Sequence, residues 1–183
     1  MEIDVLAAQY AKSKGKTVIL DCGGSDDPIS EDLLLNLDYI SPNQTELARL
    51  DPTINLDDIV NEVRKKLISK YPNLKVLLKE GSKGSSLISS TLHAKCGPSS
   101  NEEVFKEYKI LDTVGAGDCF TGAFAAKHAE LDWSDPAKQE ANYLTSMRFG
   151  NSSAFLCITK LGAMPSMPWR KDVDAFINKY FPN

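Results

Sequence analysis

Short strand-like segments alternate with segments of helical periodicity along this 183-residue chain. Residues 17–21, 37–40 and 76–78 have the length and apolar content of strands, whereas residues 5–14 and 56–71 carry apolar residues at helical spacing. A strand that follows its neighbour through a helix runs parallel to it, so repeated units of this kind predict a parallel sheet with helices on both faces. We therefore expect an α/β fold, organised as one domain over the whole chain.

The rest of the chain adds further expected elements. Residues 31–36 are expected to form a short helix, and residues 85–90 and 105–111 an antiparallel pair of strands around a polar loop. Two or three helices then complete the chain, over residues 116–131, 137–159 and 172–181. The loops between these elements are short enough for one compact unit.

Composition and charge disfavour several classes of protein. A net charge of −4 and a pI near 5.2 argue against nucleic acid as a partner. The apolar runs are too short to cross a bilayer, and the N-terminal residues lack the apolar core of a secretion signal. The four cysteines are scattered without a C-x-x-C pair, which is typical of free thiols in the cytoplasm. We expect a cytoplasmic protein with neither nucleic-acid nor membrane partners.

Residues 112–120, DTVGAGDCF, join a strand-like segment to an apolar segment of helical periodicity. Gly115 and Gly117 let the backbone turn sharply and point N–H groups into a hollow at a helix N-terminus, where the dipole favours an anion. Asp118 beside this hollow would suit a general base next to a transferred phosphate. A plain strand–turn–helix junction, with Asp118 favouring the helix start, explains these residues about equally well. The motif G-x-G-x-x-G is not completed, because Phe120 stands at its third glycine.

Residues 41–46, SPNQTE, come directly after an expected strand. Part of this segment has a structural explanation as a helix start. Ser41 would be the N-cap, the following proline the first helical residue, and Gln44 the capping-box partner of Ser41. Asn43 and Glu46 are left without a structural explanation. Both would lie near the carboxyl end of a parallel strand, which is where ligands bind in open α/β sheets.

Residues 79–84, KEGSKG, lie between two expected strands. Glycine and serine are common in hairpin loops, so the segment can be explained as a connection alone. It is not a Walker A loop, because G-x-x-x-x-G-K-[ST] does not occur. A nucleotide-binding role would depend on close approach of its backbone and on the charge of Lys83.

The motif DTVGAGD closely resembles the D-T-x-G-A-G-D signature of the ribokinase-like sugar kinases, also called the phosphofructokinase-B family. The resemblance implies that Asp118 is the catalytic base that contacts the substrate hydroxyl. It also implies that Gly115, Ala116 and Gly117 form the anion hole. The segments RFGN and GAMPSMPWR near the C-terminus resemble those of ribokinases in particular. The implied fold has three layers, α/β/α, with a mainly parallel sheet.

Asn43-x-x-Glu46 is similar to the family's N-x-x-E motif, which implies that Glu46 orients Mg²⁺ through water while Asn43 contacts phosphate beside the metal. Residues 79–84 resemble a T-x-G-x-x-G loop along the nucleotide, with Lys79 in place of the usual threonine. The other implied nucleotide contacts are Gly81, Ser82, Lys83, Gly84, Gly117 and Asn151, the last beside the adenine. A K⁺ site is implied at Asp112, Val114, Cys157, Lys160, Gly162 and Ser166, mostly through main-chain carbonyls.

The resemblance covers only the C-terminal part of a family kinase. The N-terminal strands, the glycine pair that embraces the sugar and the small β lid, through which such kinases often dimerise, have no counterpart here. Residues 1–4 resemble the middle of the family's Q-x-E-x-P stretch at a strand end, which implies that Glu2 contacts the sugar. We therefore expect residues 1–183 to be a piece of a homodimeric kinase, inactive alone.

The favoured hypothesis is ATP-dependent phosphorylation of a sugar hydroxyl, with ribose giving ribose 5-phosphate, and with Mg²⁺ and K⁺ as cofactors. A fructokinase or nucleoside kinase of the same family is the first alternative, because sugar choice depends on the part without a counterpart. The second alternative is a truncated, non-catalytic nucleotide-binding protein. Asp118 and Glu46 favour descent from an active enzyme, since a protein that only binds nucleotide needs no base.

Overall fold

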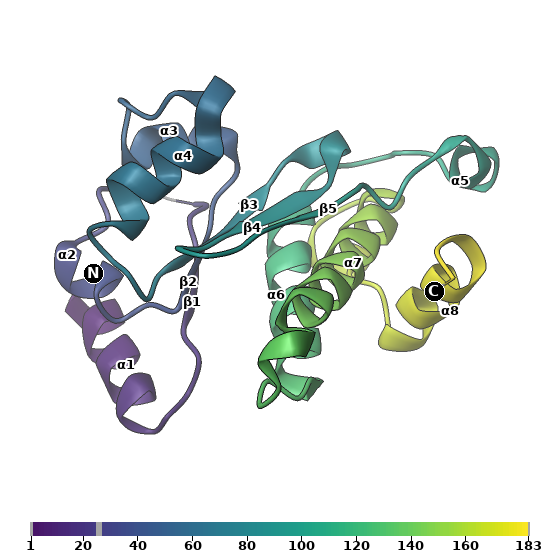
Figure 1. The fold of residues 1–183 in the computed structure, drawn as a ribbon. Helices are drawn as coiled ribbons and strands as arrows, with labels where there is room; N and C mark the ends of the chain where they lie inside the picture. Colours follow the sequence, from purple (N-terminus) through teal and green to yellow (C-terminus); the bar gives the residue numbers. More distant parts are fainter. Residues whose placement is uncertain (1, 25–26, 183) are drawn as a thin grey trace. The chain divides into compact units, whose positions relative to one another are not determined.

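The structure, a computed structural model, describes residues 2–24 and 27–182 (Figure 1). Its helices are α1 (Glu2–Ser13), α2 (Glu31–Leu34), α3 (Gln44–Leu50), α4 (Ile59–Val63), α5 (Glu102–Glu107), α6 (Ala116–Glu130), α7 (Gln139–Ile158) and α8 (Arg170–Tyr180). Its strands are β1 (Ile19–Asp21), β2 (Tyr39–Ser41), β3 (Lys75–Lys79), β4 (Ser85–Ile88) and β5 (His93–Cys96). The chain divides into two compact units: the first contains residues 1–80 and 86–93, and the second contains residues 81–85 and 94–183.

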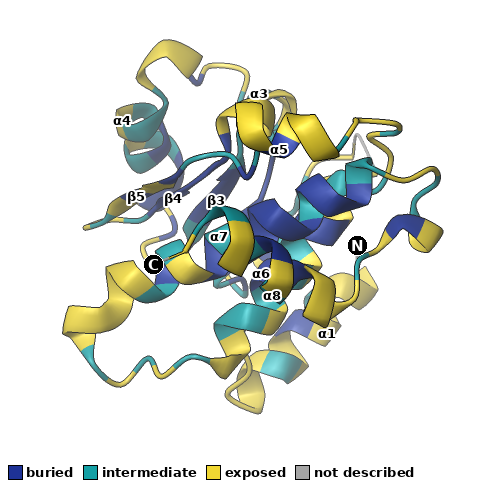
Figure 2. Cartoon of the chain, turned by 90° about the vertical axis from the view of Figure 1, so that its right-hand side faces the viewer, coloured by how far each residue is buried: buried dark blue, intermediate teal, exposed yellow. Residues whose placement is uncertain are grey.

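The strands pair in the order β1-β2-β3-β4-β5. β1 pairs with β2, and β2 with β3, in parallel, so that Ile19 lies opposite Tyr39 and Tyr39 opposite Lys75. This part confirms the alternation of strands and helices expected from the sequence. β4 and β5 each follow the preceding strand after a connection too short for a parallel crossover, so the sheet is mixed. β3 and β4 are buried over most of their length, as their dark blue colour in Figure 2 shows.

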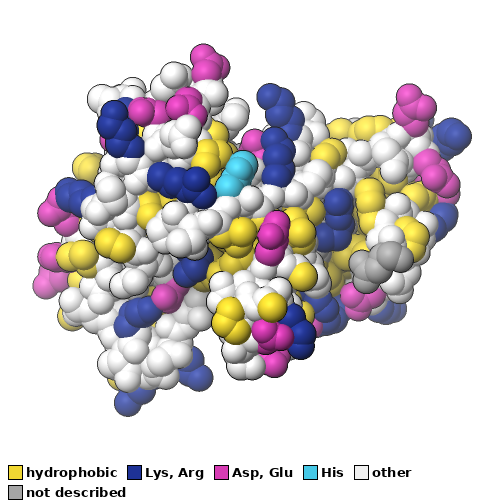
Figure 3. All heavy atoms as spheres, in the orientation of Figure 1, with side chains coloured by type: hydrophobic (Ala, Val, Ile, Leu, Met, Phe, Trp, Pro, Cys, Tyr) yellow, Lys and Arg dark blue, Asp and Glu magenta, His cyan; other side chains and the backbone are white. Residues whose placement is uncertain are grey.

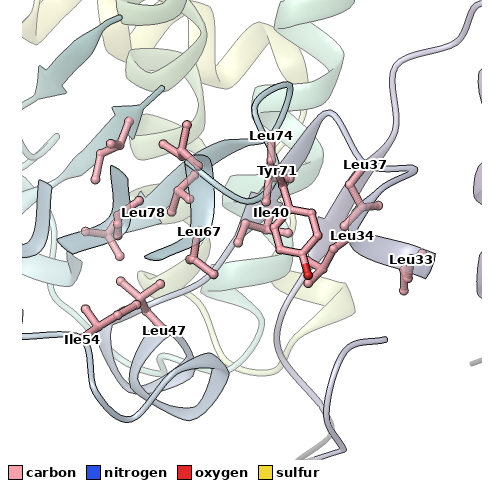
Figure 4. Close-up of a cluster of buried hydrophobic side chains, with 14 of the residues drawn as sticks. Leu33, Leu34, Leu37, Ile40, Leu47, Ile54, Leu67, Tyr71, Leu74 and Leu78 are labelled. Atoms are coloured by element: carbon pink, nitrogen blue, oxygen red, sulfur yellow. The ribbon is translucent and has the colours of Figure 1, made fainter. Parts of the chain in front are cut away.

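The core of the first unit is a cluster of aliphatic side chains with one tyrosine (Figure 4). Ile40 of β2 and Leu78 of β3 are fully buried, and Leu47 of α3 and Val63 of α4 belong to the same cluster. Full burial of a side chain of this size contributes about 1.5–3 kcal/mol. The helices between the first three strands are therefore held in place by burial of their apolar side chains.

The second unit is built around α6 and α7, which pack along each other, with α8 packed on α7. Phe155 of α7 and Phe176 of α8 stack with their ring centroids 5.5 Å apart. Phe149, Val104 and Val173 are buried in the same cluster. The three helices lie close to the ranges expected from the sequence.

Residues 105–111 do not form the expected strand. α5 occupies Glu102–Glu107 instead, and the side-chain oxygen of Asn101 accepts a hydrogen bond from the Val104 N–H at 2.9 Å. The helix is favoured because Asn101 caps it, two glutamates lie in its first turn, and Tyr108 packs edge-on against Phe155. The hairpin partner of β4 is β5, which the sequence analysis missed.

The long helix expected over residues 56–71 is also divided. A 3₁₀ turn at Leu56–Asp58 leads into α4, and a π-helical segment follows at Arg64–Ile68. Val63 and Leu67 are buried, so the apolar face expected from the spacing is retained through the change of helical type.

In the described part of the chain, every helix is too short or too polar to cross a membrane. On the face drawn in Figure 3, acidic and basic side chains are interspersed. This mixture accords with the small net charge of −4.

Replacing Gly84 with alanine should destabilise the chain more than replacing Gly81 in the same loop. Both glycines have positive φ, +93° and +57°, which costs an alanine about 1–2 kcal/mol. At Gly84 the new Cβ would also lie 2.2 Å from the Cys96 carbonyl oxygen, whereas at Gly81 it meets nothing within 4 Å. We expect urea unfolding to show a loss of about 3 kcal/mol for Gly84→Ala. Equal losses in the two variants would contradict the close approach.

Candidate active site

The carboxyl ends of the three parallel strands bring polar side chains together in the first unit. Asp21 ends β1 and Lys79 ends β3, while Asn43 follows β2 and forms an isolated parallel bridge with Lys79. The Lys79 N–H donates to the Pro42 carbonyl at 2.8 Å, which holds the backbone extended beyond the end of β2. α3 begins directly afterwards, so Glu46 in its first turn lies at the same edge.

This extended backbone moves the helix cap away from the expected position. Ser41 is not the N-cap, because it is the last residue of β2 and lies opposite Asp21. Asn43 is the N-cap: its side-chain oxygen accepts from the Glu46 N–H at 2.9 Å, and Glu46 Oε2 accepts from the Asn43 N–H at 2.7 Å. The pair that the sequence analysis left without a structural explanation is therefore a reciprocal capping box.

Lys79 connects these groups electrostatically. Its Nζ lies 2.8 Å from Asp21 Oδ1 and 3.6 Å from Glu46 Oε2, and its side chain is only 13% exposed. Asp21 was missed by sequence reasoning, although an acidic residue at the end of an expected parallel strand is a usable signal. Burial raises the pKa of the neighbouring Cys22 thiol to about 12, and the negative charges of Asp21 and Glu46 add to the effect.

A cavity of about 680 Å³ opens beside these residues within the first unit. Asp21, Gly23 and Glu46 form part of its wall, and Arg49 and Lys70 add positive charge to the lining. Solvent and small ions can therefore reach the two carboxylates from the cavity.

In the second unit, Asp112 fixes the turn that precedes α6. Its Oδ1 accepts from the Val114 N–H at 3.0 Å, and its Oδ2 accepts from the Gly162 N–H at 2.9 Å. These backbone hydrogen bonds lower the pKa of the Asp112 carboxyl. One carboxylate thus ties the expected catalytic turn to the loop at the end of α7.

Gly115 is the N-cap of α6, with φ of +80°. A Cβ at this position would lie 3.0 Å from that of Ala163, so the tight turn requires glycine for space as well as conformation. The Cys119 N–H donates to the Gly115 carbonyl, and the Ala116 N–H closes the turn on the Thr113 carbonyl at 3.3 Å. Gly117 follows within the first turn of the helix, where backbone N–H groups lack intrahelical partners.

Asp118 lies in that first turn and is exposed, so its carboxylate is accessible to a substrate. α6 has 15 residues, long enough for its dipole to add positive potential at this end. An exposed carboxylate and the positive end of a helix dipole therefore lie at one helix terminus.

The six residues of the implied K⁺ site all lie in the second unit, and hydrogen bonds connect most of them. Cys157 Sγ lies 3.0 Å from Ser166 Oγ and 4.0 Å from the Val114 carbonyl oxygen. The Lys160 N–H donates to the Cys157 carbonyl at 3.1 Å, and Asp112 holds Gly162. Carbonyl, hydroxyl and carboxylate oxygens suit a monovalent cation, so this group of residues fits K⁺.

Residues 81–84 of the implied nucleotide loop are also in the second unit, whereas Lys79 belongs to the first. Residues 81–83 form a 3₁₀ turn, which the Gly84 N–H closes on the Gly81 carbonyl at 3.1 Å. Asn151, expected beside adenine, is buried and donates to the Gly97 carbonyl at 3.1 Å. Arg148 donates to the same carbonyl at 3.1 Å and to the Pro98 carbonyl at 3.0 Å. Asn151 and Arg148 thus hold the loop that packs against Gly84.

The resemblance implied a strand end at Glu2, and the structure contradicts this. Glu2 is the first residue of α1 and is exposed. The expected site residues otherwise divide between the units: Asn43, Glu46 and Lys79 lie in the first, and residues 81–84, 112–118, 151 and 157–166 lie in the second.

Mg²⁺ commonly binds proteins through one or two carboxylates and keeps several of its waters. Asp21 and Glu46 supply two carboxylates around one ammonium, so they fit such an ion if Lys79 moves aside. Within residues 2–24 and 27–182, no three His, Cys, Asp or Glu side chains gather as a metal site. A divalent ion here would therefore depend on water and on phosphate for its other ligands.

Comparison with known proteins identifies the family. The pfkB family of carbohydrate kinases matches residues 2–170, and the chain belongs to this family. A ribokinase of Arabidopsis thaliana is 38% identical over 173 residues, which are 93% of this chain and 41% of that protein. A probable fructokinase-3 of the same plant is 30% identical over 139 residues, 75% of this chain and 36% of that protein.

Solved structures agree with the sequence relatives. The structure of Arabidopsis thaliana ribokinase complexed with ribose and ATP matches this chain with a TM-score of 0.79 and 36% sequence identity. The match covers 96% of this chain and 52% of the ribokinase chain. A Vibrio cholerae fructokinase with fructose, ADP and potassium bound has a TM-score of 0.72 at 22% identity, over 93% of this chain and 53% of that one, and shows the fold alone. The chain spans about half the length of these relatives or less.

The capping box predicts different effects for two changes at Glu46. Glu46→Gln should leave the unfolding free energy nearly unchanged, because its amide oxygen can accept the Asn43 N–H and Asp21 remains the counter-ion of Lys79. Glu46→Ala should cost about 1 kcal/mol, similar to Asn43→Ala. Urea unfolding of the three variants measures this. If Glu46→Gln destabilised as much as Glu46→Ala, the cap would not explain the role of Glu46 in folding.

Proposed function

We propose that this chain is the nucleotide-binding and catalytic part of an ATP-dependent sugar kinase that converts ribose to ribose 5-phosphate. The observation that carries the proposal is the turn at residues 112–118, where Asp118 stands exposed at the N-terminus of α6. Membership of a carbohydrate kinase family and 38% identity to a plant ribokinase support this reaction and this sugar.

In the proposed reaction, the sugar hydroxyl oxygen forms a bond to the γ-phosphorus of ATP while the bond from that phosphorus to the bridging oxygen of ADP breaks. Asp118 accepts the hydroxyl proton. Backbone N–H groups at Gly115, Ala116 and Gly117 hold the negative charge of the transferred group. For this role, the Ala116 N–H leaves the Thr113 carbonyl, to which its 3.3 Å hydrogen bond is long and therefore weak.

The nucleotide would lie along residues 81–84, with Lys83 near its phosphates and Asn151 at the adenine end. Asn43 and Glu46 would serve phosphate and Mg²⁺, which when bound neutralises charge on the transferred phosphate. The cluster from Asp112 to Ser166 would hold K⁺, which adds positive potential beside the anion hole without touching the reacting phosphate. The capping box at Asn43 and Glu46 supports this arrangement by fixing both side chains at the sheet edge.

The rest of the proposed enzyme follows from the length of its relatives. A further segment would complete a three-layer α/β/α fold, supply the sugar contacts to which Glu2 belongs, and carry a lid through which two copies pair. Residues 1–183 alone would then bind nucleotide without transferring phosphate, because nothing would hold the sugar hydroxyl against Asp118. Orientation of this kind supplies about 7–11 kcal/mol of a barrier.

A fructokinase is the second candidate, supported by the 30% identity to the plant protein described as a probable fructokinase-3. Competition between ribose and fructose for phosphorylation separates the two candidates. Preference for fructose would replace the proposed substrate and leave the proposed base unchanged.

Asp118→Asn tests the base. The test protein is a hybrid kinase in which the N-terminal part of the Arabidopsis ribokinase precedes residues 1–183. We expect turnover with ribose and ATP to fall by about 10²–10⁴, while calorimetry shows nearly unchanged ADP affinity. Glu140→Gln, in the first turn of α7, is the matched control and should leave turnover intact. Turnover of Asp118→Asn within threefold of the parent hybrid would remove Asp118 from this role.

Potassium should activate the hybrid kinase more than sodium does, because carbonyl oxygens near Cys157 and Gly162 would suit the larger, more weakly hydrated ion. Asp112→Asn should reduce the difference, since an amide nitrogen cannot accept one of the two backbone hydrogen bonds that Asp112 now receives. Rates in chloride salts of the two ions at one ionic strength provide the measurement. Equal rates in both salts would exclude a functional K⁺ site at this loop.

A further inference from the structure

The Lys79 ammonium is held by two carboxylates at the edge of the sheet in the first unit. Asp21 Oδ1 lies 2.8 Å from its Nζ, and Glu46 Oε2 lies 3.6 Å from it. The three side chains are 13%, 25% and 10% exposed for Lys79, Asp21 and Glu46. Charges this far removed from water require opposite charges nearby, so each of these groups depends on the others.

Backbone hydrogen bonds fix the position of the Lys79 main chain. Its N–H donates to the Pro42 carbonyl, and the residue pairs with Asn43 in a parallel bridge. Glu46 is fixed through its hydrogen bond from the Asn43 N–H, and Asp21 through one from the Gly23 N–H at 3.1 Å. Main-chain contacts therefore fix both carboxylates and the backbone from which the Lys79 side chain extends.

The same two carboxylates are the groups in the first unit that fit a magnesium ion. They line the 680 Å³ cavity, so an ion and its waters can approach them from that side. A lysine ammonium and a divalent ion cannot both lie close to the pair at no cost, because like charges a few ångströms apart repel strongly where water is scarce. Lys79 and the metal therefore compete for one pair of carboxylates.

We propose that the Lys79 ammonium is a built-in counter-ion of the Asp21–Glu46 pair that a divalent cation must displace, so that Lys79 sets the metal concentration the protein requires. The use of the bound metal rests on the proposed kinase function, whereas the competition itself does not. Displaced from Glu46, Lys79 is free to turn its charge toward a phosphate group that arrives with the metal.

Removing the ammonium should strengthen metal binding. In Lys79→Met the two carboxylates lose the ammonium that contacts both of them, so the pair attracts Mg²⁺ more strongly and the ion relieves more of their mutual repulsion. We expect calorimetry on residues 1–183, without nucleotide, to show Mg²⁺ binding tighter by about tenfold or more than in the unmodified chain. Thermal unfolding should show a larger rise in Tm on adding Mg²⁺ to Lys79→Met than to the unmodified chain.

Two further variants make the test specific. Lys12→Met removes a lysine that pairs with Asp38 at 2.6 Å in the same unit, away from Asp21, and should leave Mg²⁺ affinity unchanged. Lys79→Gln keeps a hydrogen-bond donor to Asp21 and serves as a second variant in case Lys79→Met does not fold. It should also bind Mg²⁺ more tightly than the unmodified chain, by a smaller factor than Lys79→Met. Unchanged or weaker Mg²⁺ affinity in the folded Lys79 variants, or equal tightening in Lys12→Met, would overturn the proposal.

The outcome is separable from that of the proposed function. Tighter Mg²⁺ binding in Lys79→Met together with a hybrid kinase that transfers no phosphate would support the competition and contradict the kinase. Unchanged Mg²⁺ binding in Lys79→Met together with phosphoryl transfer that depends on Asp118 would contradict the competition and support the kinase.

Discussion

Parallel pairing of β1, β2 and β3 is the constraint on which the first half of the candidate site depends. The register places Asp21 opposite Ser41 and, through the bridge of Asn43 with Lys79, brings the ends of three strands to one edge. An acidic residue, a helix cap and a lysine meet there although they are far apart in the sequence. The capping box has two effects: it stabilises the first turn of α3, and it fixes the position of the Glu46 carboxylate.

A single carboxylate has the corresponding role in the second unit. Asp112 accepts backbone hydrogen bonds from the turn before α6 and from the loop after α7, and it is the first residue of the DTVGAGD motif. The motif therefore joins a structural anchor, Asp112, to a tight glycine turn and an exposed acid, Asp118. These seven residues therefore indicated both the start of α6 and the family to which the chain belongs.

The sequence was sufficient where local chemistry decides the structure. Three helices expected near the C-terminus correspond to α6, α7 and α8, and apolar runs located β1 to β3. The sequence was insufficient where contacts between distant residues determine the structure. Pairing with β3 extends the backbone past Ser41, so that Asn43 caps α3, and the ion pair of Lys79 with Asp21 joins residues 58 positions apart. The strand expected at residues 105–111 failed because Asn101 caps a helix, a local signal that was overlooked.

Phosphorus NMR of the reaction products tests the proposed phosphoryl transfer from ATP to a sugar hydroxyl at Asp118 most directly. The hybrid kinase, supplied with ATP, ribose, Mg²⁺ and K⁺, should produce ADP and ribose 5-phosphate in equal amounts. Release of inorganic phosphate without a sugar phosphate, or absence of turnover while ADP still binds, would contradict the account.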